Sequence, residues 1–480
     1  MGRVLSVDAL EDAGIEIVEK VAPLAKLIKE SPQASILARH LLDFENIISK
    51  EHWNELDRQE KQTLSETEAD HIVIPEKQPN KKAERRKYTG YTDKYDIKRC
   101  EANFEIAASI KRRADKIRSE DEQRWSETMK GLVFGRLIER ARRQEGAMHK
   151  QKAENVVKRF RVDTLHQYCQ KTFFHLTAPK PDLYFGFHAY VQGDNETGPL
   201  RGDDYVENFS VTRLSQLYEA DVGFVPSPCK EFFGLKELKI KDLTCFPWAV
   251  CEWKHEGKID TRDEKKAYYQ AANGAAVCLT LFANAAVGGR PFPILHDIRP
   301  VVCMTFTGPK AKVWVAYVTE VEDGRYRYRM RCIWEGSLRN ILDNVKLCVI
   351  IENLHFWAMN HLRPWLTSCI DQWRRSIEER EDTESSFGKI GRAATWGSFV
   401  SRDDGHLDDD DSYEGSDGEE GSDGDENSET EEDENDDSDE SGDEDEEDPD
   451  ESGDECDGCD CACHNGVYSK TFSIRNRRMS

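Results

Sequence analysis

No stretch of the sequence resembles a membrane-spanning helix of ~20 apolar residues, and we expect none. Its first residues, MGRVLSVDALEDAGIEIVEK, lack the apolar core of a secretory signal. Ten cysteines from Cys100 to Cys369 occur singly among apolar residues, which is typical of reduced, packed thiols. We therefore expect an intracellular protein, nuclear or cytoplasmic rather than secreted, with no membrane partner.

Basic residues are missing from a long C-terminal segment. Between Arg402 and Lys470 there is no Lys or Arg, and residues 401–460 contain 34 Asp and Glu. The net charge of the whole chain is -26, so without these acids the remainder carries about +8. Residues 381–455 cannot bury enough apolar surface to offset their chain entropy, and we expect a disordered acidic tail. Such a tail favours basic protein partners, or masks a basic surface elsewhere on the chain.

Two common catalytic motifs are also absent. No Gly-rich loop leads into a Lys-Ser or Lys-Thr pair, and no Gly-x-Ser-x-Gly segment occurs. The sequence therefore gives no sign of a P-loop nucleotide site or of a hydrolase nucleophile elbow.

The N-terminal third has the pattern of helices. Apolar spacing predicts two helices within residues 1–50, followed by a polar linker that ends at residue 95. Residues 81–87 of the linker are a basic run, which is either a solvated segment or a nuclear-import signal or phosphate contact. Residues 96–172 predict long helices with basic faces. We expect the nucleic-acid contacts there to come from Lys111, Arg112, Arg113, Arg142 and Arg143.

The middle of the chain alternates strands and helices. Strands are predicted near 182–187, 246–254, 301–306, 313–318 and 326–333, with an insertion at 191–245 that holds a helix at 211–220. A helix with a capping-box pattern is predicted to begin at Thr261 and to end before Gly288. Two further helices are predicted from about residue 337 toward Trp373. The order predicts an α/β domain over 96–380, core about 150–375, with a mixed central sheet flanked by helices.

Two predicted strands carry polar residues at one end. Glu252 and Lys254 are two apart on an apolar strand, so they share a face, and Asp182 opens another apolar strand after Pro181. If these strands are neighbours, both carboxylates can reach one hard cation, and Mg²⁺ binds in proteins through one or two carboxylates plus water and phosphate. The alternative is an exposed Glu–Lys pair on a strand, which would contribute little.

Pro181-Asp182 followed by Glu252-Trp253-Lys254 resembles the signature of the PD-(D/E)XK nuclease superfamily, which has the restriction-endonuclease-like fold. The segments 246–255 and 269–272 are similar to fungal nuclease-like domain proteins of that superfamily. The resemblance implies metal-dependent hydrolysis of nucleic acid, with Mg²⁺ or Mn²⁺ on Asp182 and Glu252. It implies that Lys254 assists hydrolysis and that Gln270, on the following helix, lines the site. It also makes Glu154, on a preceding helix, a candidate metal ligand.

Several alternatives remain open at this point. The separation of Asp182 and Glu252 is longer than usual in the superfamily, and Asp221 is a second candidate for the aspartate. Gln270 could instead be a polar residue at a helix–sheet seam. A catalytically inactive module that keeps the fold and binds nucleic acid or protein is the competing function.

A second candidate metal site lies in the C-terminal segment 456–480. Cys456, Cys459, Cys461, Cys463 and His464 fall within nine residues and could bind Zn²⁺. The alternative is an unstructured thiol patch, because structural zinc sites usually separate two ligand pairs by a foldable stretch.

Overall fold

The computed structural model describes residues 5–62, 64–74, 96–116, 122–146, 160–163, 176–190, 204–220, 224–228, 244–254, 261–288, 295–322 and 325–386. All of them belong to one compact unit, Met1–Asp403. Glu154, Asp221, the acidic tail beyond residue 386 and the cysteine cluster at 456–464 lie outside the described residues.

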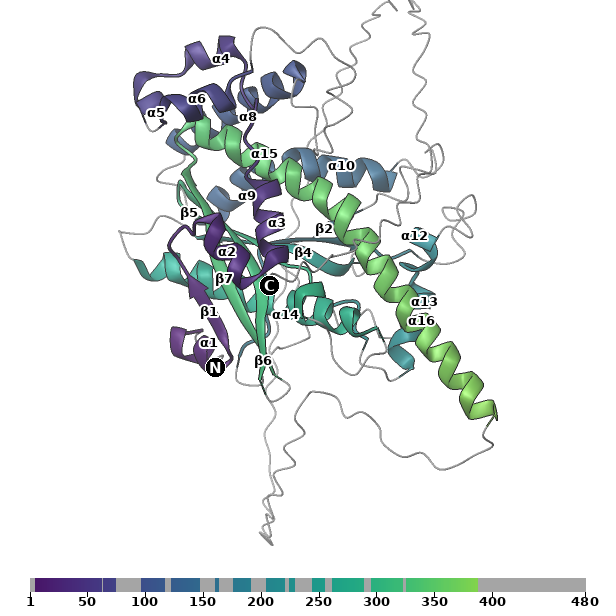
Figure 1. The fold of residues 1–480 in the computed structure, drawn as a ribbon. Coiled ribbons are helices and arrows are strands. Elements are labelled where there is room, and N and C mark those ends of the chain that lie inside the picture. The colour runs from purple at the N-terminus through teal and green to yellow at the C-terminus, as the bar shows by residue number, and fades with distance from the viewer. Residues whose placement is uncertain are drawn as a thin grey trace, which may run out of the picture. The chain divides into compact units, whose positions relative to one another are not determined.

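Seven strands of the described chain form one open, mixed sheet (Figure 1). They are β1 (Ile15–Val18), β2 (Phe160–Asp163), β3 (Leu183–His188), β4 (Thr244–Lys254), β5 (Val301–Thr307), β6 (Lys310–Glu322) and β7 (Arg325–Ser337). Their order is β1-β7-β6-β5-β4-β3-β2. The pairs β1–β7 and β4–β5 are parallel and the other four are antiparallel. The predicted α/β class with a mixed, helix-flanked sheet is confirmed.

The helices fall into an N-terminal and a C-terminal series. The first comprises α1 (Val7–Asp12), α2 (Leu24–Glu30), α3 (Pro32–Leu41), α4 (Lys50–Glu55), α5 (Arg58–Gln62), α6 (Glu66–Ile72), α8 (Ile97–Lys116), α9 (Glu122–Val133) and α10 (Gly135–Gly146). The second comprises α12 (Asp204–Glu207), α13 (Val211–Glu219), α14 (Thr261–Val287), the 3₁₀ turn η4 (Leu295–Asp297), α15 (Ile341–Trp357), the π-helical η5 (Ala358–Leu362) and α16 (Arg363–Ser386).

Helix α14 connects the parallel strands β4 and β5 and packs on both. Its small residues allow a close approach to the sheet: a Cβ on Gly274 would lie 3.2 Å from a methyl group of Val250. Residues Glu264–Val287 are long and apolar enough to cross a membrane by length and composition, but 78% of that window is buried in the fold. A core helix of a soluble protein passes the same test, so this is weak evidence for a membrane span.

Helices also cover the opposite face of β4. Trp253 points away from Val250 because side chains alternate along a strand. Its ring packs edge-on against Phe134, between α9 and α10, with the ring centroids 5.7 Å apart. The buried strand β4 is therefore covered on both faces, which explains its nearly continuous apolar sequence.

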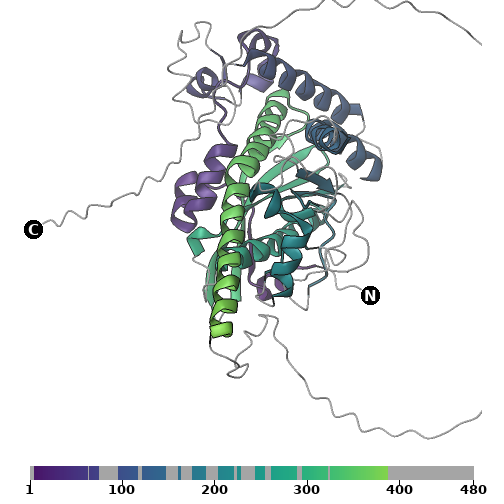
Figure 2. The same cartoon turned by 90° about the vertical axis from the view of Figure 1, so that its right-hand side faces the viewer.

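The predicted pair of C-terminal helices forms one continuous rod (Figure 2). The π-helical η5 joins α15 to α16, and α16 continues to Ser386, past the predicted boundary at residue 380. Asn340 caps the start of α15, since its side-chain oxygen accepts a hydrogen bond from the Asp343 N–H.

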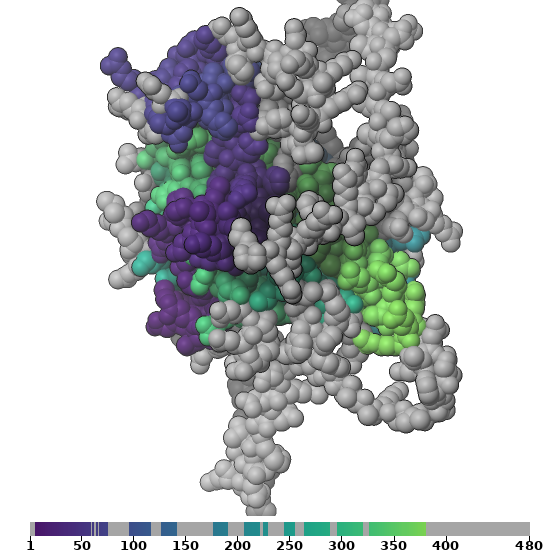
Figure 3. Space-filling view, in the orientation of Figure 1, coloured from purple at the N-terminus to yellow at the C-terminus, as the bar shows by residue number. Residues whose placement is uncertain are grey.

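Two helix predictions were wrong. Residues 15–18 form the edge strand β1, parallel to β7, instead of a helix. Gly14 makes the turn before it with a φ of 68°. Residues 160–163, predicted helical, form strand β2 beside β3. The N-terminal region is therefore part of the same sheet and not a separate helical extension. Figure 3 shows this purple segment lying against green elements of the C-terminal half.

The cysteine prediction holds for the described thiols. Eight of them, Cys100, Cys245, Cys251, Cys278, Cys303, Cys332, Cys348 and Cys369, are buried and unbonded to one another. Burial raises the pKa of the Cys100 thiol to about 11, so it stays protonated and behaves as a small apolar side chain.

Candidate metal and nucleic-acid site

The antiparallel pairing of β3 and β4 brings the two predicted carboxylates together. Leu183 pairs with Cys251, so Asp182 lies beside Glu252 at the end of the ladder. The Trp253 N–H donates to Asp182 Oδ2 at 2.8 Å. The two side chains are close enough for the charge of Asp182 to act on the Glu252 carboxyl group. The condition set by the sequence, that these strands be neighbours, is met.

Glu252 is the buried member of the pair. Glu252 is only 1% exposed to solvent. Burial raises its pKa well above the usual value, and the neighbouring Asp182 charge raises it further, while Lys254 opposes the shift. Without a cation, the pair therefore favours a protonated Glu252 that donates to the Asp182 carboxylate.

Lys254 lies on the same face as Glu252, as alternation predicted. Its Nζ is 4.0 Å from Asp182 Oδ2 and donates to the Trp253 carbonyl oxygen at 2.8 Å. The side chains of Lys254 and Asp182 are 15% and 22% exposed. The site is thus closed at Glu252 and open to solvent at Asp182 and Lys254.

Two of the predicted site residues have a buried oxygen that lacks a hydrogen-bond partner among the described residues: Glu252 Oε2 and Gln270 Oε1. Buried polar atoms are normally paired, and leaving one unpaired costs about 1–3 kcal/mol. Carboxylate and amide oxygens are ligands that Mg²⁺ and Mn²⁺ accept. The residues present therefore fit a divalent cation held by Asp182 and Glu252; Gln270 lies on α14, which packs on β4.

The site offers few candidate oxygen ligands for a metal. In the described part of the chain no group of three or more His, Cys, Asp and Glu residues is placed to hold a metal. Two carboxylates and an amide are nevertheless sufficient for Mg²⁺, which usually retains several waters and takes further oxygens from a substrate phosphate.

A polar row extends from the carboxylates across the sheet, and the sequence analysis missed it. Glu252 pairs with Thr305 of β5, Thr305 with Lys312 of β6, and Lys312 with Glu335 of β7. The Thr305 hydroxyl accepts a hydrogen bond from Trp314 Nε1 at 2.9 Å. No local motif signals this row, because it depends on the register of four strands.

Glu264 of α14 lies at the far end of this row. Lys310 Nζ lies 2.6 Å and Lys312 Nζ 3.3 Å from its Oε1, and the Tyr268 hydroxyl donates to the same oxygen. Burial alone would raise the pKa of Glu264, but these donors hold it below its usual value. The capping-box pattern at residues 261–264 thus serves to tie α14 to the β5–β6 hairpin.

Lys130 of α9 is a second residue that the sequence did not single out. Its Nζ lies 5.2 Å from the centroid of the Trp253 ring, on the face of β4 opposite Glu252. Trp253 therefore connects three groups: its backbone holds Asp182 and Lys254, and its ring receives the Lys130 cation.

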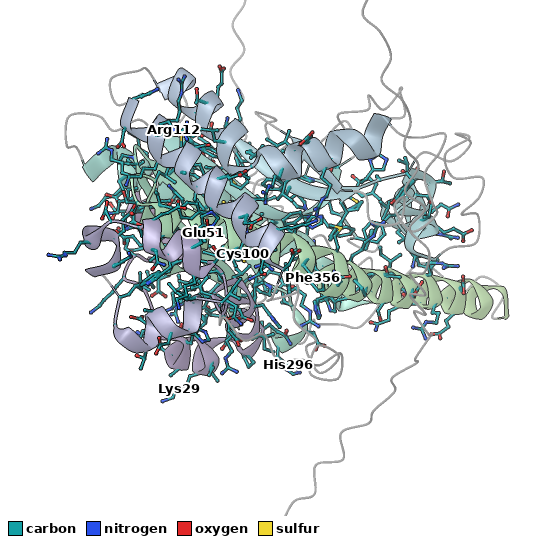
Figure 4. All side chains as sticks on the ribbon, turned by 90° about the horizontal axis from the view of Figure 1, so that it is seen from above. Lys29, Glu51, Cys100, Arg112, His296 and Phe356 are labelled. Carbon is teal, nitrogen blue, oxygen red and sulfur yellow. The ribbon has the colours of Figure 1, made fainter. Side chains whose placement is uncertain are left out.

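The predicted nucleic-acid contacts divide into three groups. Lys111 is engaged within the fold, with its Nζ 3.0 Å from Glu60 and 3.8 Å from Asp57. Arg112, labelled in Figure 4, is exposed, and with Arg113 it borders a cavity of about 460 Å³ between α8 and α9. Arg142 and Arg143 lie on α10, and the structure does not describe their side chains.

Comparisons with family models, with curated proteins and with solved structures found no match.

Proposed function

We propose that this protein is a metal-dependent nuclease of the restriction-endonuclease-like fold, which hydrolyses phosphodiester bonds of nucleic acid. One observation carries the proposal. Two carboxyl groups from adjacent strands meet beside a lysine, and the buried Glu252 Oε2 has no hydrogen-bond partner in the described chain.

The arrangement of elements supports the proposed fold. Strands β2, β3 and β4 form an antiparallel series, α14 crosses over, and β5 returns parallel to β4. The candidate residues sit at one end of this unit: Asp182 before β3, Glu252 and Lys254 at the end of β4, and Gln270 on α14. These are the positions that the sequence resemblance implied.

Each side chain has a distinct part in the proposed reaction. Asp182 and Glu252 would hold Mg²⁺ or Mn²⁺, which when bound polarises the phosphate and lowers the pKa of a bound water. Lys254, at the open side of the site, would orient the attacking water or stabilise the charge that develops on the phosphate. Gln270 would orient the Glu252 carboxylate or a ligand water. Glu252 must lose its proton on metal binding, because only the carboxylate is a ligand.

Substrate would approach from the exposed side of Asp182 and Lys254. The cations of Arg112, Arg113 and Lys116 border a separate cavity, where they would contact the phosphate backbone without reading sequence. The acidic tail as a ligand for basic proteins, and the cysteine-rich segment as a zinc site, stay predictions from the sequence.

The test is cleavage of labelled single- and double-stranded DNA and RNA with Mg²⁺ or Mn²⁺. Wild type is compared with Lys254→Ala and with Lys265→Ala, which removes an exposed lysine of α14 away from the carboxylate pair. We expect metal-dependent cleavage by wild type and Lys265→Ala, and a loss of about 10²-fold or more in Lys254→Ala.

Two results would contradict catalysis. One is equal cleavage by all three proteins, which would point to a contaminating nuclease or a different catalytic group. The other is no cleavage by any of them while nucleic acid is still bound. That outcome would favour the competing function, a binding module that keeps the fold, with Arg112 and Arg113 as its contacts.

A further inference from the structure

A second polar cavity lies at the other end of β5 from the carboxylate pair. It has a volume of about 100 Å³ and is lined by Gln33, Ile36, His40, Arg299, Pro300, Trp357 and His361. Arg299 precedes β5, whereas Thr305, beside Glu252, is near its end. At ~3.3 Å per residue the two places are about 20 Å apart, so the cavity is distinct from the proposed active site.

Arg299 supplies a cation with a spare donor. Its Nη1 donates to Gln33 Oε1, and its guanidinium lies 5.6 Å from the centroid of the Trp365 ring. Its Nε is buried and has no hydrogen-bond partner among the described residues. Nor does any described carboxylate lie within ion-pair distance of Arg299. A partly buried arginine in this state favours an anion that accepts its remaining hydrogen bonds.

Two stacked histidines complete the polar side of the cavity. The rings of His40 and His361 have centroids 5.9 Å apart. The ring of Phe356, labelled in Figure 4, lies 6.4 Å from that of His361. His361 belongs to the π-helical η5, and such wide turns occur frequently at functional sites.

Burial lowers the pKa of both His40 and His361, and their positive neighbours lower it further. At neutral pH the rings are therefore largely uncharged, and a neutral imidazole has one N–H donor and one acceptor nitrogen. Arg299 then provides the fixed positive charge. Asp43 and Asp297, which affect His40 and Arg299, do not line the cavity.

We propose that this cavity binds inorganic phosphate, with Arg299 as the charged donor and Gln33, His40 and His361 as further hydrogen-bonding groups. The volume of about 100 Å³ suits a small ligand such as one tetrahedral oxyanion. The proposal does not depend on nuclease activity.

The rim of the cavity allows a test that leaves the core intact. Ile36 is 46% exposed, so Ile36→Glu and Ile36→Lys place opposite charges at the opening without changing buried packing. Ile28→Glu is the matched control, because Ile28 is 41% exposed on α2 and does not line the cavity. Phosphate binding to the full chain is measured by titration calorimetry at constant ionic strength, with chloride as the reference anion.

We expect wild type and Ile28→Glu to bind phosphate equally. Ile36→Glu should weaken binding by about two- to fivefold, and Ile36→Lys should leave it equal or tighter. Arg299→Ala should lose at least about tenfold in affinity, since hydrogen bonds to charged groups are strong. A thermal unfolding scan of each variant checks that it is folded.

Three results would overturn the proposal. The first is the absence of phosphate binding by wild type at millimolar concentrations. The second is the same affinity in Ile36→Glu and Ile36→Lys, which would show that phosphate binds elsewhere. The third is a nucleoside triphosphate that binds more tightly than phosphate and loses that affinity in Ile36→Glu, which would contradict the size of the ligand.

Discussion

Replacing Glu252 by Gln should make the protein more stable while removing its response to divalent cations. In wild type without metal, Glu252 is buried against a second acid, and its Oε2 has no partner in the described chain. A glutamine amide can donate to the Asp182 carboxylate without needing a proton. Removing an uncompensated buried carboxyl in this way should add about 1–3 kcal/mol to the free energy of unfolding.

The response to metal should change in the opposite direction. A ligand that binds only the folded state at a hundredfold excess over its Kd stabilises by about 2.7 kcal/mol. Wild type should therefore gain several degrees in Tm when Mg²⁺ or Mn²⁺ is added. Glu252→Gln should gain little, because a neutral amide replaces one of the two carboxylates.

The assay is thermal unfolding of each protein with EDTA and with Mg²⁺ or Mn²⁺. Glu264→Gln is the matched control, since Glu264 faces the same side of the sheet but is paired with Lys310 and Lys312. It should lose stability and keep the metal response. Equal metal-induced shifts in wild type and Glu252→Gln would refute the assignment of Glu252 as a ligand. A lower Tm for Glu252→Gln in EDTA would refute the argument that the acid pair is unfavourable.

Three further predictions concern stability and binding. Gly186→Ala should destabilise the fold by about 1–3 kcal/mol in urea unfolding, because the new Cβ would lie 2.4 Å from Thr244 Cγ2. Gly131→Ala is the control and should be neutral or stabilising, because a Cβ there would have no atom within 4 Å. Glu30→Gln should cost about 1–3 kcal/mol at neutral pH. Burial alone would raise the pKa of Glu30, but Tyr317, Arg331 and Arg329 hold it below its usual value. The stabilisation that the Glu30 carboxylate gives is therefore complete above its pKa in the unfolded chain, and it is lost as the pH falls through its lower pKa in the folded chain. A urea midpoint difference that did not shrink in acid would contradict it. The double substitution Arg112→Glu and Arg113→Glu should weaken nucleic-acid binding and make the affinity depend less on salt concentration. Lys111→Ala should mainly reduce stability, because Lys111 is paired with Glu60. An equal loss of binding in both variants would show that Lys111 also contacts nucleic acid.

Local patterns predicted the central elements of the fold well. Strand β4 follows from the apolar run 246–253, and α14 from the alanine-rich stretch that ends at Gly288. The alternation of Glu252, Trp253 and Lys254 placed the first and last on one face, as found. These features depend on neighbouring residues, which the sequence contains directly.

Strands β1 and β2 were missed because each has only four residues. Ile15, Val18 and Val21 are spaced by three, which also fits a helical stripe, and a short edge strand offers too few residues to show a period of two. The strand is decided by its pairing with β7, more than 300 positions along the chain. Propensity over a short segment cannot anticipate such a partner.

The site itself was predictable only in part. The sequence proposed Asp182 and Glu252, but whether they meet depended on β3 and β4 being adjacent across a long insertion. Lys130 and the Thr305–Lys312 row were beyond reach, since they depend on which helix covers Trp253 and on the register of β5 with β6. The local sequence was enough to predict candidate metal-binding residues, but it was not enough to predict which residues lie next to them in the fold.

The charged partners of other buried carboxylates in the fold differ from those of Glu252. Glu30, Glu60 and Glu264 are each largely buried or half-buried, and each has a cation at 2.8 Å, 3.0 Å and 2.6 Å, respectively. Glu252 is more buried than any of these, yet its nearest charged neighbour in the site is another acid, Asp182, whose Oδ2 lies 4.0 Å from Lys254 Nζ. Lysine or arginine partners could serve Glu252 in the same way as they serve these three carboxylates. Two acids side by side, one of them fully buried, are unfavourable for folding alone, and they become favourable when a cation binds between them.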